Sequence, residues 1–382
     1  MNNIYDKLNS SYRKVYKHDK FIPLHEPIFK GNEKKYLLDC IDSTFVSSVG
    51  KYVDEFQEKI KEFVSCKYAV ATINGTSALH LALLSCDIGF DDEVICPDIS
   101  FVATAAAITY TGASPIFLDI DETTLGLSPD KVEDFIIKNT YEKDGYRFNK
   151  ITHKKIKACL PMHNIGFPVL INTLVELCKK YNILLIEDAA EALGSTIDGK
   201  MCGTFGDVGI YSFNGNKIIT TGGGGMLVTD NEELYKKALH LSTTAKKNHP
   251  YKYIHDNIGY NYRMPNLNAA LGVAQLELLP RVLEKKYEQG KLIEKNLSCN
   301  KLIDIIQSSY GISNRWFIVA NLNGIKLDDF IMEMGKRNIM ARPMWSQISK
   351  MDPYKKYYSS CNDISAKVIE TYVCLPNGVY YE

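Results

Sequence analysis

The chain has 382 residues and a mass of 43.1 kDa, more than one compact core usually holds, so we expect a large domain and a smaller one. Its 45 basic residues are balanced by 45 acidic ones, which argues against nucleic acid or an anionic membrane as a partner. The polar opening segment and the lack of a long apolar run predict a protein without signal peptide or membrane anchor. The ten cysteines form no C-x-x-C pair, which argues against a metal site and favours free thiols in the cytoplasm.

Short apolar runs alternate with helical patterns from about Tyr68 onward, which is typical of βαβ units. The pairs are YAVATI with TSALHLALLS, DEVICP with FVATAAAITYTG, and SPIFLDI with SPDKVEDFIIKN. The runs KIKACLPMH and ILLIED, with a helical pattern between them, continue the alternation. We therefore predict an α/β fold whose first two thirds hold a largely parallel sheet covered by helices.

The pattern changes beyond Asn231. A long helical pattern runs from about Pro265 to Asn296, interrupted late by Gly290, and a weaker mixed pattern follows it. These features predict a linking helix and a smaller α+β domain. We place the large cofactor-binding domain at residues 1–250, and the linking helix with the small domain at residues 251–382.

The junction ATINGTSALHLAL brings small and hydroxylated residues to the point where a strand ends and a helix begins. Gly75, Thr76 and Ser77 lie there, and a helix N-terminus offers unpaired N–H groups that suit a phosphate. The alternative is that Thr76 or Ser77 only caps the helix. Taken alone, the junction leaves both interpretations open.

Glu187 and Asp188 end the strand ILLIED, at the place where open α/β sheets bind their ligands. A carboxylate there can hold a basic ring nitrogen in its protonated form, because a neighbouring negative charge favours the charged form. A carboxylate at a strand end is also often a helix cap. Phe101, near the end of another strand, is placed either to stack on a planar ring or to pack in the core.

Lys217 follows Ser212 by five residues and precedes four consecutive glycines, Gly222–Gly225. A lysine in a turn is most often solvated surface, and glycines often only form a flexible turn. A lysine can also form a Schiff base with an aldehyde, and glycines permit the close backbone approach that a flat cofactor needs. A phosphate cradle, a stacking ring, an acid and a lysine in this order match the requirements of pyridoxal 5′-phosphate.

These residues resemble the sugar-nucleotide aminotransferases of the DegT/DnrJ/EryC1/StrS family. The similarity starts at IPLHEPIFKGNEKKYLLDCIDSTFVSSVGKYVDEFQEKIKEF and fades after Pro343. Between them lie the motifs NGTSALHLAL, PDISFVATAAAI, GASPIFLDID, EDAAEALGS, GDVGIYSFNGNKIITTGGGGMLVTD and DNIGYNYRMPNLNAALGVAQLELL. The resemblance implies a fold-type I aminotransferase with a mostly parallel seven-stranded sheet, a smaller C-terminal α+β domain and an N-terminal segment that forms a lip over the substrate.

The resemblance also implies pyridoxal 5′-phosphate as cofactor and a role for each matching residue. Lys217 would hold the cofactor covalently, Asp188 would pair with its ring nitrogen, and Phe101 would cover its ring. The residues that would bind its phosphate are Gly75, Thr76, Ser77 and Ser212.

Further implied residues concern the dimer and the substrate. Asn261 in GYNYRM would reach the phosphate of the neighbouring subunit's cofactor, so a homodimer would share its active sites, and Arg263 would lie near the substrate. Glu191 stands where many relatives have Gln or His beside the cofactor's O3′. HNIGFP replaces the commoner HLYGQP, and its His163 is either a structural hydrogen-bonding residue or a substrate contact.

Within the family, HEPIFKGNEKKYLLDCIDSTFVSSVG is most similar to the branch that makes UDP-4-amino-4,6-dideoxy sugars for surface glycans of the legionaminic acid or bacillosamine type. This similarity implies L-glutamate as amino donor and UDP-2-acetamido-2,6-dideoxy-hexos-4-ulose as acceptor. Amination of a GDP- or dTDP-linked keto-sugar at C3 or C4 is an alternative. Three other classes of protein are disfavoured. A sugar dehydratase that uses pyridoxamine phosphate usually has histidine in place of Lys217. The sequence shows neither the basic DNA-binding segment expected of a regulator without turnover nor the G-x-G-x-x-G motif expected of an NAD-dependent enzyme.

Overall fold

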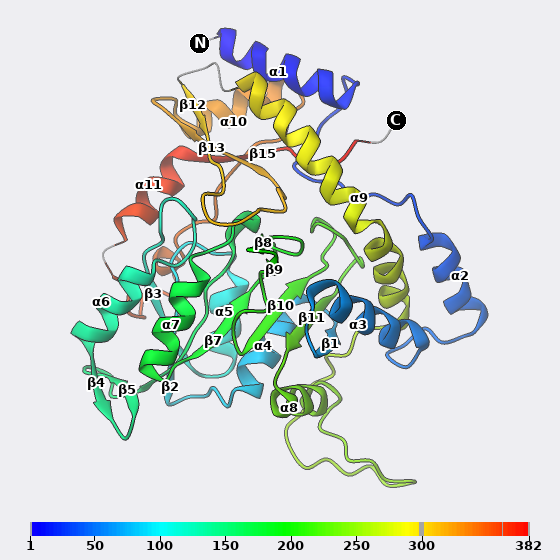
Figure 1. Ribbon diagram of the computed structural model, residues 1–382, viewed down its shortest axis with the longest axis vertical. Coiled ribbons are helices and arrows are strands. Elements are labelled where there is room, and N and C mark those ends of the chain that lie inside the picture. Colours follow the sequence, from blue (N-terminus) through cyan, green and yellow to red (C-terminus); the bar gives the residue numbers. More distant parts are fainter. Residues whose placement is uncertain (1, 298–301, 361, 381–382) are drawn as a thin grey trace.

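A nine-stranded sheet forms the centre of the computed structural model, which describes residues 2–297, 302–360 and 362–380 (Figure 1). In these residues the main path of the sheet runs in the order β1 (Tyr68–Thr72), β11 (Gly225–Thr229), β10 (Val208–Ser212), β7 (Leu184–Asp188), β6 (Lys155–Cys159), β2 (Asp92–Pro97) and β3 (Ser114–Leu118). Neighbours from β10 to β3 pair in parallel, whereas β11 is antiparallel to β1 and β10. The predicted α/β architecture with a mostly parallel sheet is confirmed.

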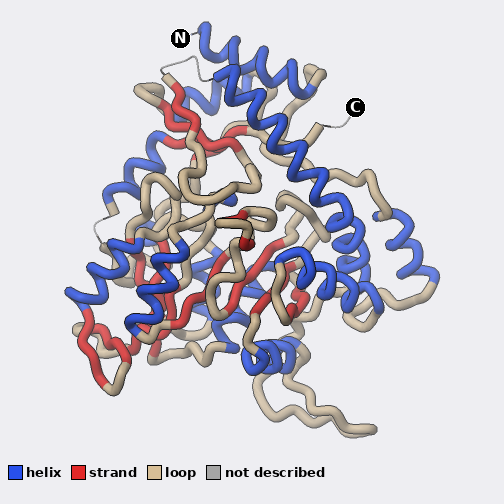
Figure 2. The backbone as a smooth tube through the Cα atoms, viewed as in Figure 1, coloured by secondary structure: helices blue, strands red, loops and turns tan. Residues whose placement is uncertain are grey.

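Helices cover both faces of this sheet, which explains why its inner strands are almost continuously apolar (Figure 2). The helices on one face are α3 (Lys51–Val64), α6 (Pro129–Asn139) and α7 (Ile171–Tyr181). Those on the other face are α4 (Gly75–Ser85), α5 (Ala103–Tyr110) and α8 (Glu232–Ser242). Because β2, β7 and β10 run in the same direction, their carboxyl ends lie at one edge of the sheet.

A hairpin of β4 (Thr140–Lys143) and β5 (Tyr146–Asn149) extends the sheet beside β6, so the sheet in the described residues has nine strands where seven were expected. Asp144 and Gly145 join its strands with φ values of 53° and 77°. An Asp-Gly pair with two positive φ values forms a two-residue turn whose twist matches that of the flanking strands. This dipeptide was therefore a sequence signal for the hairpin.

The long helix α9 (Asn266–Leu297) leads from the central sheet to a second, antiparallel sheet (Figure 1). The order of this sheet is β12 (Ile303–Ile305), β13 (Ile318–Leu322), β15 (Tyr372–Leu375) and β14 (Arg342–Pro343). The helix continues through Gly290, so the predicted interruption there is wrong. A Cβ atom at Gly290 would lie 3.0 Å from the Arg315 side chain, so this glycine lets α9 pack closely against the chain ahead of β13. Among the described helices, including α9, none combines the length and the apolar character needed to cross a bilayer.

The first helix, α1 (Asn2–Tyr16), packs on the second sheet (Figure 1). Its buried Leu8 and Tyr12 join a core to which Ile318 of β13 and Phe330 of α10 (Leu327–Lys336) also belong. The helix α11 (Asp363–Thr371) contributes Val368 to a separate cluster. Segments from both ends of the chain thus share one core, and the division at residue 250 stays a prediction.

Two buried aspartates connect the segment after β14 to the central sheet. Asp98, directly after β2, accepts hydrogen bonds from the side chains of Ser349 at 2.9 Å and Asn362 at 2.7 Å. Asp119, directly after β3, accepts bonds from the N–H of Ser365 at 2.9 Å and from its hydroxyl at 2.6 Å. Buried carboxylates with several donors hold two parts of a chain in one arrangement. The C-terminal segment is therefore fixed against the edge of the sheet at which the parallel strands end.

Lys286 on α9 is fully buried, and its Nζ donates hydrogen bonds to the carbonyl oxygens of Trp316 and Asn377. Burial lowers the pKa of this amine from 10.5 to about 7. Between these two values the unfolded chain binds more protons at this residue than the folded chain does. The contribution of Lys286 to the free energy of unfolding therefore rises with pH in this window and is constant below it.

We predict that Lys286→Met removes the rise with pH that Lys286 gives to the free energy of unfolding. The free energy of unfolding of the variant, minus that of the wild type, should fall between pH 7 and 10 by up to about 1.4 kcal/mol per pH unit. Urea unfolding at several pH values measures this difference. Lys285→Met is the control, because the Lys285 side chain is 40% exposed and should give a difference that does not change with pH. Equal pH dependence in both variants would contradict the prediction.

Candidate active site

A pocket of about 350 Å³ lies at the carboxyl edge of the central sheet, where β7 and β10 end and α4 begins. The sequence-predicted residues that line it are Gly75, Thr76, Phe101, Asp188, Ser212 and Lys217. The fold thus brings the helix N-terminus, the aromatic ring, the acid and the lysine to one place, although they are far apart in the chain. This is the edge at which parallel α/β sheets bind ligands.

The N-terminus of α4 forms one side of the pocket. Asn74 caps this helix, since its side chain accepts a hydrogen bond from the N–H of Ser77 at 2.7 Å. A Cβ atom at Gly75 would lie only 2.8 Å from Cβ of Ser212, so glycine permits the helix to begin this close to β10. The N–H groups of the first helical turn and the hydroxyls of Thr76 and Ser212 form a set of donors that fits a phosphate.

Asp188 is buried at the end of β7. Its Oδ2 accepts a hydrogen bond from the hydroxyl of Thr104 on α5 at 2.8 Å, and its Oδ1 accepts one from the N–H of Ala190 at 3.1 Å. Burial raises the pKa of this carboxyl above its ordinary value, and the bond from Thr104 acts in the opposite direction. A cationic ring nitrogen in the pocket would supply a charge that favours the ionised carboxylate.

Lys217 is only 9% exposed, so it is not the solvated surface lysine that its place in a turn could suggest. Its Nζ lies 3.1 Å from Oε1 of Glu191 and 4.3 Å from the ring centroid of Trp316. The ring of Phe101 is farther away, with its centroid at 5.9 Å. The amine thus faces one carboxylate and two aromatic rings, a surrounding that stabilises a cation.

The glycines after Lys217 allow close contact between β11 and the start of α4. A Cβ atom at Gly225 would lie 2.5 Å from the carbonyl oxygen of Asn74, and one at Gly224 would lie 2.2 Å from Oγ1 of Thr221. A side chain at Gly225 would therefore displace the backbone at the start of α4, and one at Gly224 would displace the side chain of Thr221. Of the four glycines, these two are a packing requirement beneath the site.

Glu191 connects Lys217 to two other parts of the chain. Its Oε2 accepts hydrogen bonds from the N–H of Ile165 at 2.8 Å and from Nε1–H of Trp345 at 3.4 Å. Ile165 has φ 55° and ψ 22°, a left-handed conformation that is rare for a β-branched residue. The HNIGFP segment, which contains Ile165, therefore lies against the carboxylate that faces the lysine.

The sequence-predicted residues that do not line the pocket are Ser77, Glu191, His163, Asn261 and Arg263, although Glu191 contacts Lys217, which does. His163 is fully buried, with Nε2 3.0 Å from Oε2 of Glu187, and its Nδ1 accepts a bond from the N–H of Val169 at 3.2 Å. This is the structural hydrogen-bonding arrangement that the sequence left as one of two alternatives. Asn261 is exposed, and the predicted roles of these residues stay predictions.

Several pocket residues were not predicted. Trp316 and Trp345 both line the pocket, and Nε1–H of Trp316 donates to the carbonyl oxygen of Asn216 at 2.8 Å. Thr104, the partner of Asp188, lies on the helix that follows Phe101. No local pattern marks any of these side chains, because only long-range contacts bring them to the site.

Comparison with known proteins identifies the family. The model of the DegT/DnrJ/EryC1/StrS aminotransferase family matches residues 27–380. A relative named GDP-perosamine synthase, from Escherichia coli O157:H7, is 39% identical over 341 residues, which cover 89% of this chain and 88% of that protein. A Bacillus subtilis (strain 168) protein, whose name includes the words pyridoxal phosphate-dependent aminotransferase, is 35% identical over 367 residues, covering 94% of this chain and 91% of that protein. The chain therefore belongs to the DegT/DnrJ/EryC1/StrS aminotransferase family.

The solved structures agree with this assignment. The aminotransferase TlmJ from Streptoalloteichus hindustanus superposes with a TM-score of 0.84 over 93% of each chain, at 25% identity. The fold is that of the fold-type I aminotransferases, and pyridoxal 5′-phosphate is the cofactor of this class. The donors at α4, the buried acid and the shielded lysine fit that cofactor in charge and in chemical type.

We predict that Thr104→Val weakens the binding of pyridoxal phosphate about fivefold, because loss of one hydrogen bond costs about 1 kcal/mol. Without the Thr104 hydroxyl the pKa of Asp188 rises further, so the low-pH loss of cofactor affinity should begin at a higher pH than in the wild type. Cofactor titrations followed by absorbance at several pH values measure both effects. Thr109→Val on the same helix is the control, since the Thr109 hydroxyl donates to the carbonyl oxygen of Ala106 and this residue does not line the pocket. Unchanged affinity in Thr104→Val at every pH would contradict the predicted role of Asp188.

Proposed function

We propose that this protein transfers an amino group from L-glutamate to the keto carbon of a nucleotide-linked 4-keto-6-deoxy sugar. The observation that carries the proposal is the position of Lys217. Its amine is nearly buried, faces Glu191, and lines the same pocket as the phosphate-compatible N-terminus of α4 and the buried Asp188. Family membership supports the class of reaction, and the residues that line the pocket support the roles assigned to them.

The proposed cofactor contacts follow from the donor types in the pocket. The N-terminus of α4 and the hydroxyls of Thr76 and Ser212 hold the phosphate of pyridoxal 5′-phosphate, and Phe101 covers its ring. Asp188 keeps the ring nitrogen protonated. The bound cofactor supplies an aldehyde for bonding to amines and a ring that accepts the electrons of a carbanion.

Lys217 has two proposed roles. Its Nζ would hold the cofactor covalently in the resting enzyme. Once released by the amino group of the donor, the same Nζ would move the proton that leaves the α-carbon of the amino acid. Glu191, 3.1 Å from this nitrogen, keeps the freed amine in the pocket, and Trp316 shields it. The second half-reaction uses the same proton transfers in reverse on the sugar.

Two observations bear on the identity of the nucleotide, and they favour different nucleotides. The N-terminal stretch resembles the branch that uses UDP-2-acetamido-2,6-dideoxy-hexos-4-ulose. The name of the relative from Escherichia coli O157:H7, GDP-perosamine synthase, favours a GDP-linked sugar. In both readings the product is an amino sugar on a nucleotide, suited to incorporation into a surface glycan. An assay with both substrates distinguishes them.

The proposal includes a homodimer with shared active sites. Large apolar side chains lie exposed on α2 (Glu33–Asp42) and beyond it, where Ile41 is 58% and Val49 is 69% exposed. Tyr253 is 84% and Ile258 is 80% exposed in the loop ahead of Asn261. Exposed large apolar side chains that gather in one segment are typical of surfaces that a partner covers. A second copy of the chain covering them would bring Asn261 of the partner subunit toward the phosphate site.

The last part of the proposal is that the enzyme acts in the cytoplasm. The cysteines among the described residues are free thiols, and most of them are buried. Unpaired thiols are usual in a reducing compartment.

The test is amination of a panel of nucleotide keto-sugars. The enzyme loaded with pyridoxal phosphate is incubated with glutamate and with UDP-, GDP- or dTDP-linked 4-keto-6-deoxy sugars, and products are identified by mass spectrometry. We expect a 4-amino sugar from at least one of them. A product that has lost a sugar hydroxyl and gained no amino group would instead identify a dehydratase. No amination of any 4-keto sugar nucleotide would remove the substrate proposal and leave the cofactor proposal standing.

We predict that Lys217→Arg lowers amination by about 1,000-fold or more, because arginine keeps the charge but neither bonds to the aldehyde nor transfers the proton. Thermal unfolding of the variant shows whether it remains folded. Lys200→Arg, on the exposed strand β9 (Lys200–Met201), is the matched control and should keep wild-type activity. Turnover by folded Lys217→Arg at the wild-type rate would exclude the proposed role.

A further inference from the structure

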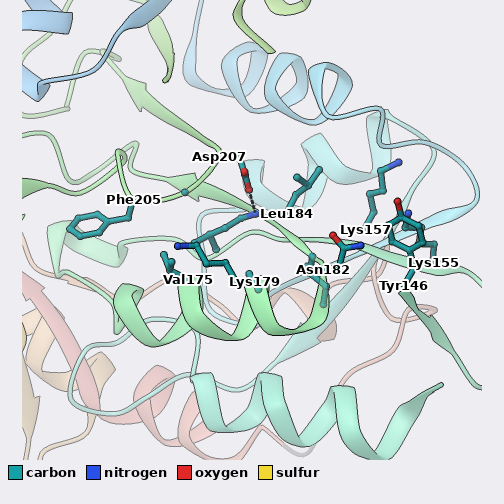
Figure 3. Close-up of a pocket in the computed structure, with 13 residues that line it drawn as sticks. Tyr146, Lys155, Lys157, Val175, Lys179, Asn182, Leu184, Phe205 and Asp207 are labelled. Carbon is teal, nitrogen blue, oxygen red and sulfur yellow. Dashed lines mark hydrogen bonds between the residues drawn. The ribbon is translucent and has the colours of Figure 1, made fainter. Parts of the chain in front are cut away.

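A second, larger pocket of about 590 Å³ lies at the opposite edge of the central sheet (Figure 3). It is formed where β6 and β7 begin and α7 ends, and its wall includes Val175, Leu184 and Phe205. The strand β7 runs from Leu184 in this pocket to Asp188 in the active-site pocket. The two pockets are therefore separate, with the length of a strand between them. A volume of this size is in the range of small-molecule sites.

Three lysines line this pocket. Lys155 and Lys157 come from β6, and Lys179 comes from α7 (Figure 3). Within the residues that the structure describes, none of the three lies within ion-pair distance of a carboxylate. Lys180, the neighbour of Lys179 outside the pocket, differs in this respect, because it pairs with Glu133 at 2.7 Å. Lys155 and Lys157 lie on one side of the pocket, and Lys179, which is exposed, lies on the other (Figure 3).

The two lysines on β6 have an unusual position. β6 is an inner strand between β2 and β7, and both side chains are partly buried there. Burial lowers the pKa of Lys155, and the charge of Lys157 lowers it further, against a weaker opposite effect of Asp92. The Nζ of Lys155 lies over the ring of Tyr146, 3.0 Å from its centroid. Inner strands usually carry apolar residues, so two partly buried, mutually repelling cations need a reason beyond solubility.

The acidic group at the pocket does not cancel this charge. Asp207 lines the pocket, but its Oδ2 accepts a hydrogen bond from the N–H of Leu185 at 2.8 Å. This hydrogen bond holds the carboxylate at the start of β7, and the lining still has three lysines to one carboxylate. A concave surface with an excess of one sign of charge concentrates ligands of the opposite sign.

We propose that this pocket binds a small anion of the di- or polyphosphate class, held by the neighbouring Lys155 and Lys157, with Lys179 adding positive charge at the other side of the pocket. Lysine is a common binder of phosphate as a point charge, and two adjacent lysines match a ligand that carries several negative charges. The volume leaves room for a group larger than one phosphate. The site is independent of the proposed transamination, because none of its residues lines the pocket of Lys217.

The test is binding of inorganic tripolyphosphate to the cofactor-loaded enzyme, measured by isothermal titration calorimetry at low ionic strength. We expect saturable binding to the wild type that weakens as salt is added. In Lys155→Ala/Lys157→Ala the affinity should fall about tenfold or more, since each lost charged hydrogen bond has a large effect. Lys155→Arg/Lys157→Arg keeps both charges and should bind within a few-fold of the wild type.

Lys180→Ala is the matched control, because this exposed lysine follows Lys179 on α7 but does not line the pocket. It should bind tripolyphosphate as the wild type does. Thermal unfolding and conversion of the bound cofactor by glutamate show that each variant is folded and keeps its active site. Two results would overturn the proposal: no saturable binding by the wild type, or equal affinity of the wild type and folded Lys155→Ala/Lys157→Ala. The second result would show that the ligand binds elsewhere on the protein.

Discussion

The close approach of the Lys217 amine to the Glu191 carboxylate, at 3.1 Å in a nearly buried pocket, is the interaction on which the site depends. A buried charge is tolerated only when it is paired and when its remaining hydrogen-bonding capacity is satisfied. Here the N–H groups of Ile165 and Trp345 satisfy the second oxygen of the carboxylate. The pair thereby links the central sheet, the segment after β6 and the C-terminal part of the chain.

Close backbone packing is the second requirement of the site. Gly75 and Gly225 allow α4, β10 and β11 to meet at distances that a Cβ atom would prevent. The N–H groups at the start of α4 therefore face the same pocket as the lysine and the acid. Parallel strands end at one edge of a sheet, so their last residues and the helix that follows form a single concave site.

The sequence predicts the sheet, the family and the six pocket residues from Gly75 to Lys217, because each lies in a local pattern or a recognisable motif. It does not predict Thr104, Trp316 and Trp345, which reach the site only through tertiary contacts. The expected break at Gly290 is wrong because packing against the chain before β13 keeps the helix continuous there. Local propensity is a weak signal where a long helix is held along its length by neighbouring segments.

Reduction of the cofactor-loaded enzyme with borohydride, followed by proteolysis and peptide mass spectrometry, tests directly whether Lys217 carries the cofactor. We predict a pyridoxyl group on the peptide that contains Lys217 and nowhere else in the chain. A pyridoxyl group on a different lysine, or no modified peptide from the fully loaded enzyme, would contradict the central claim.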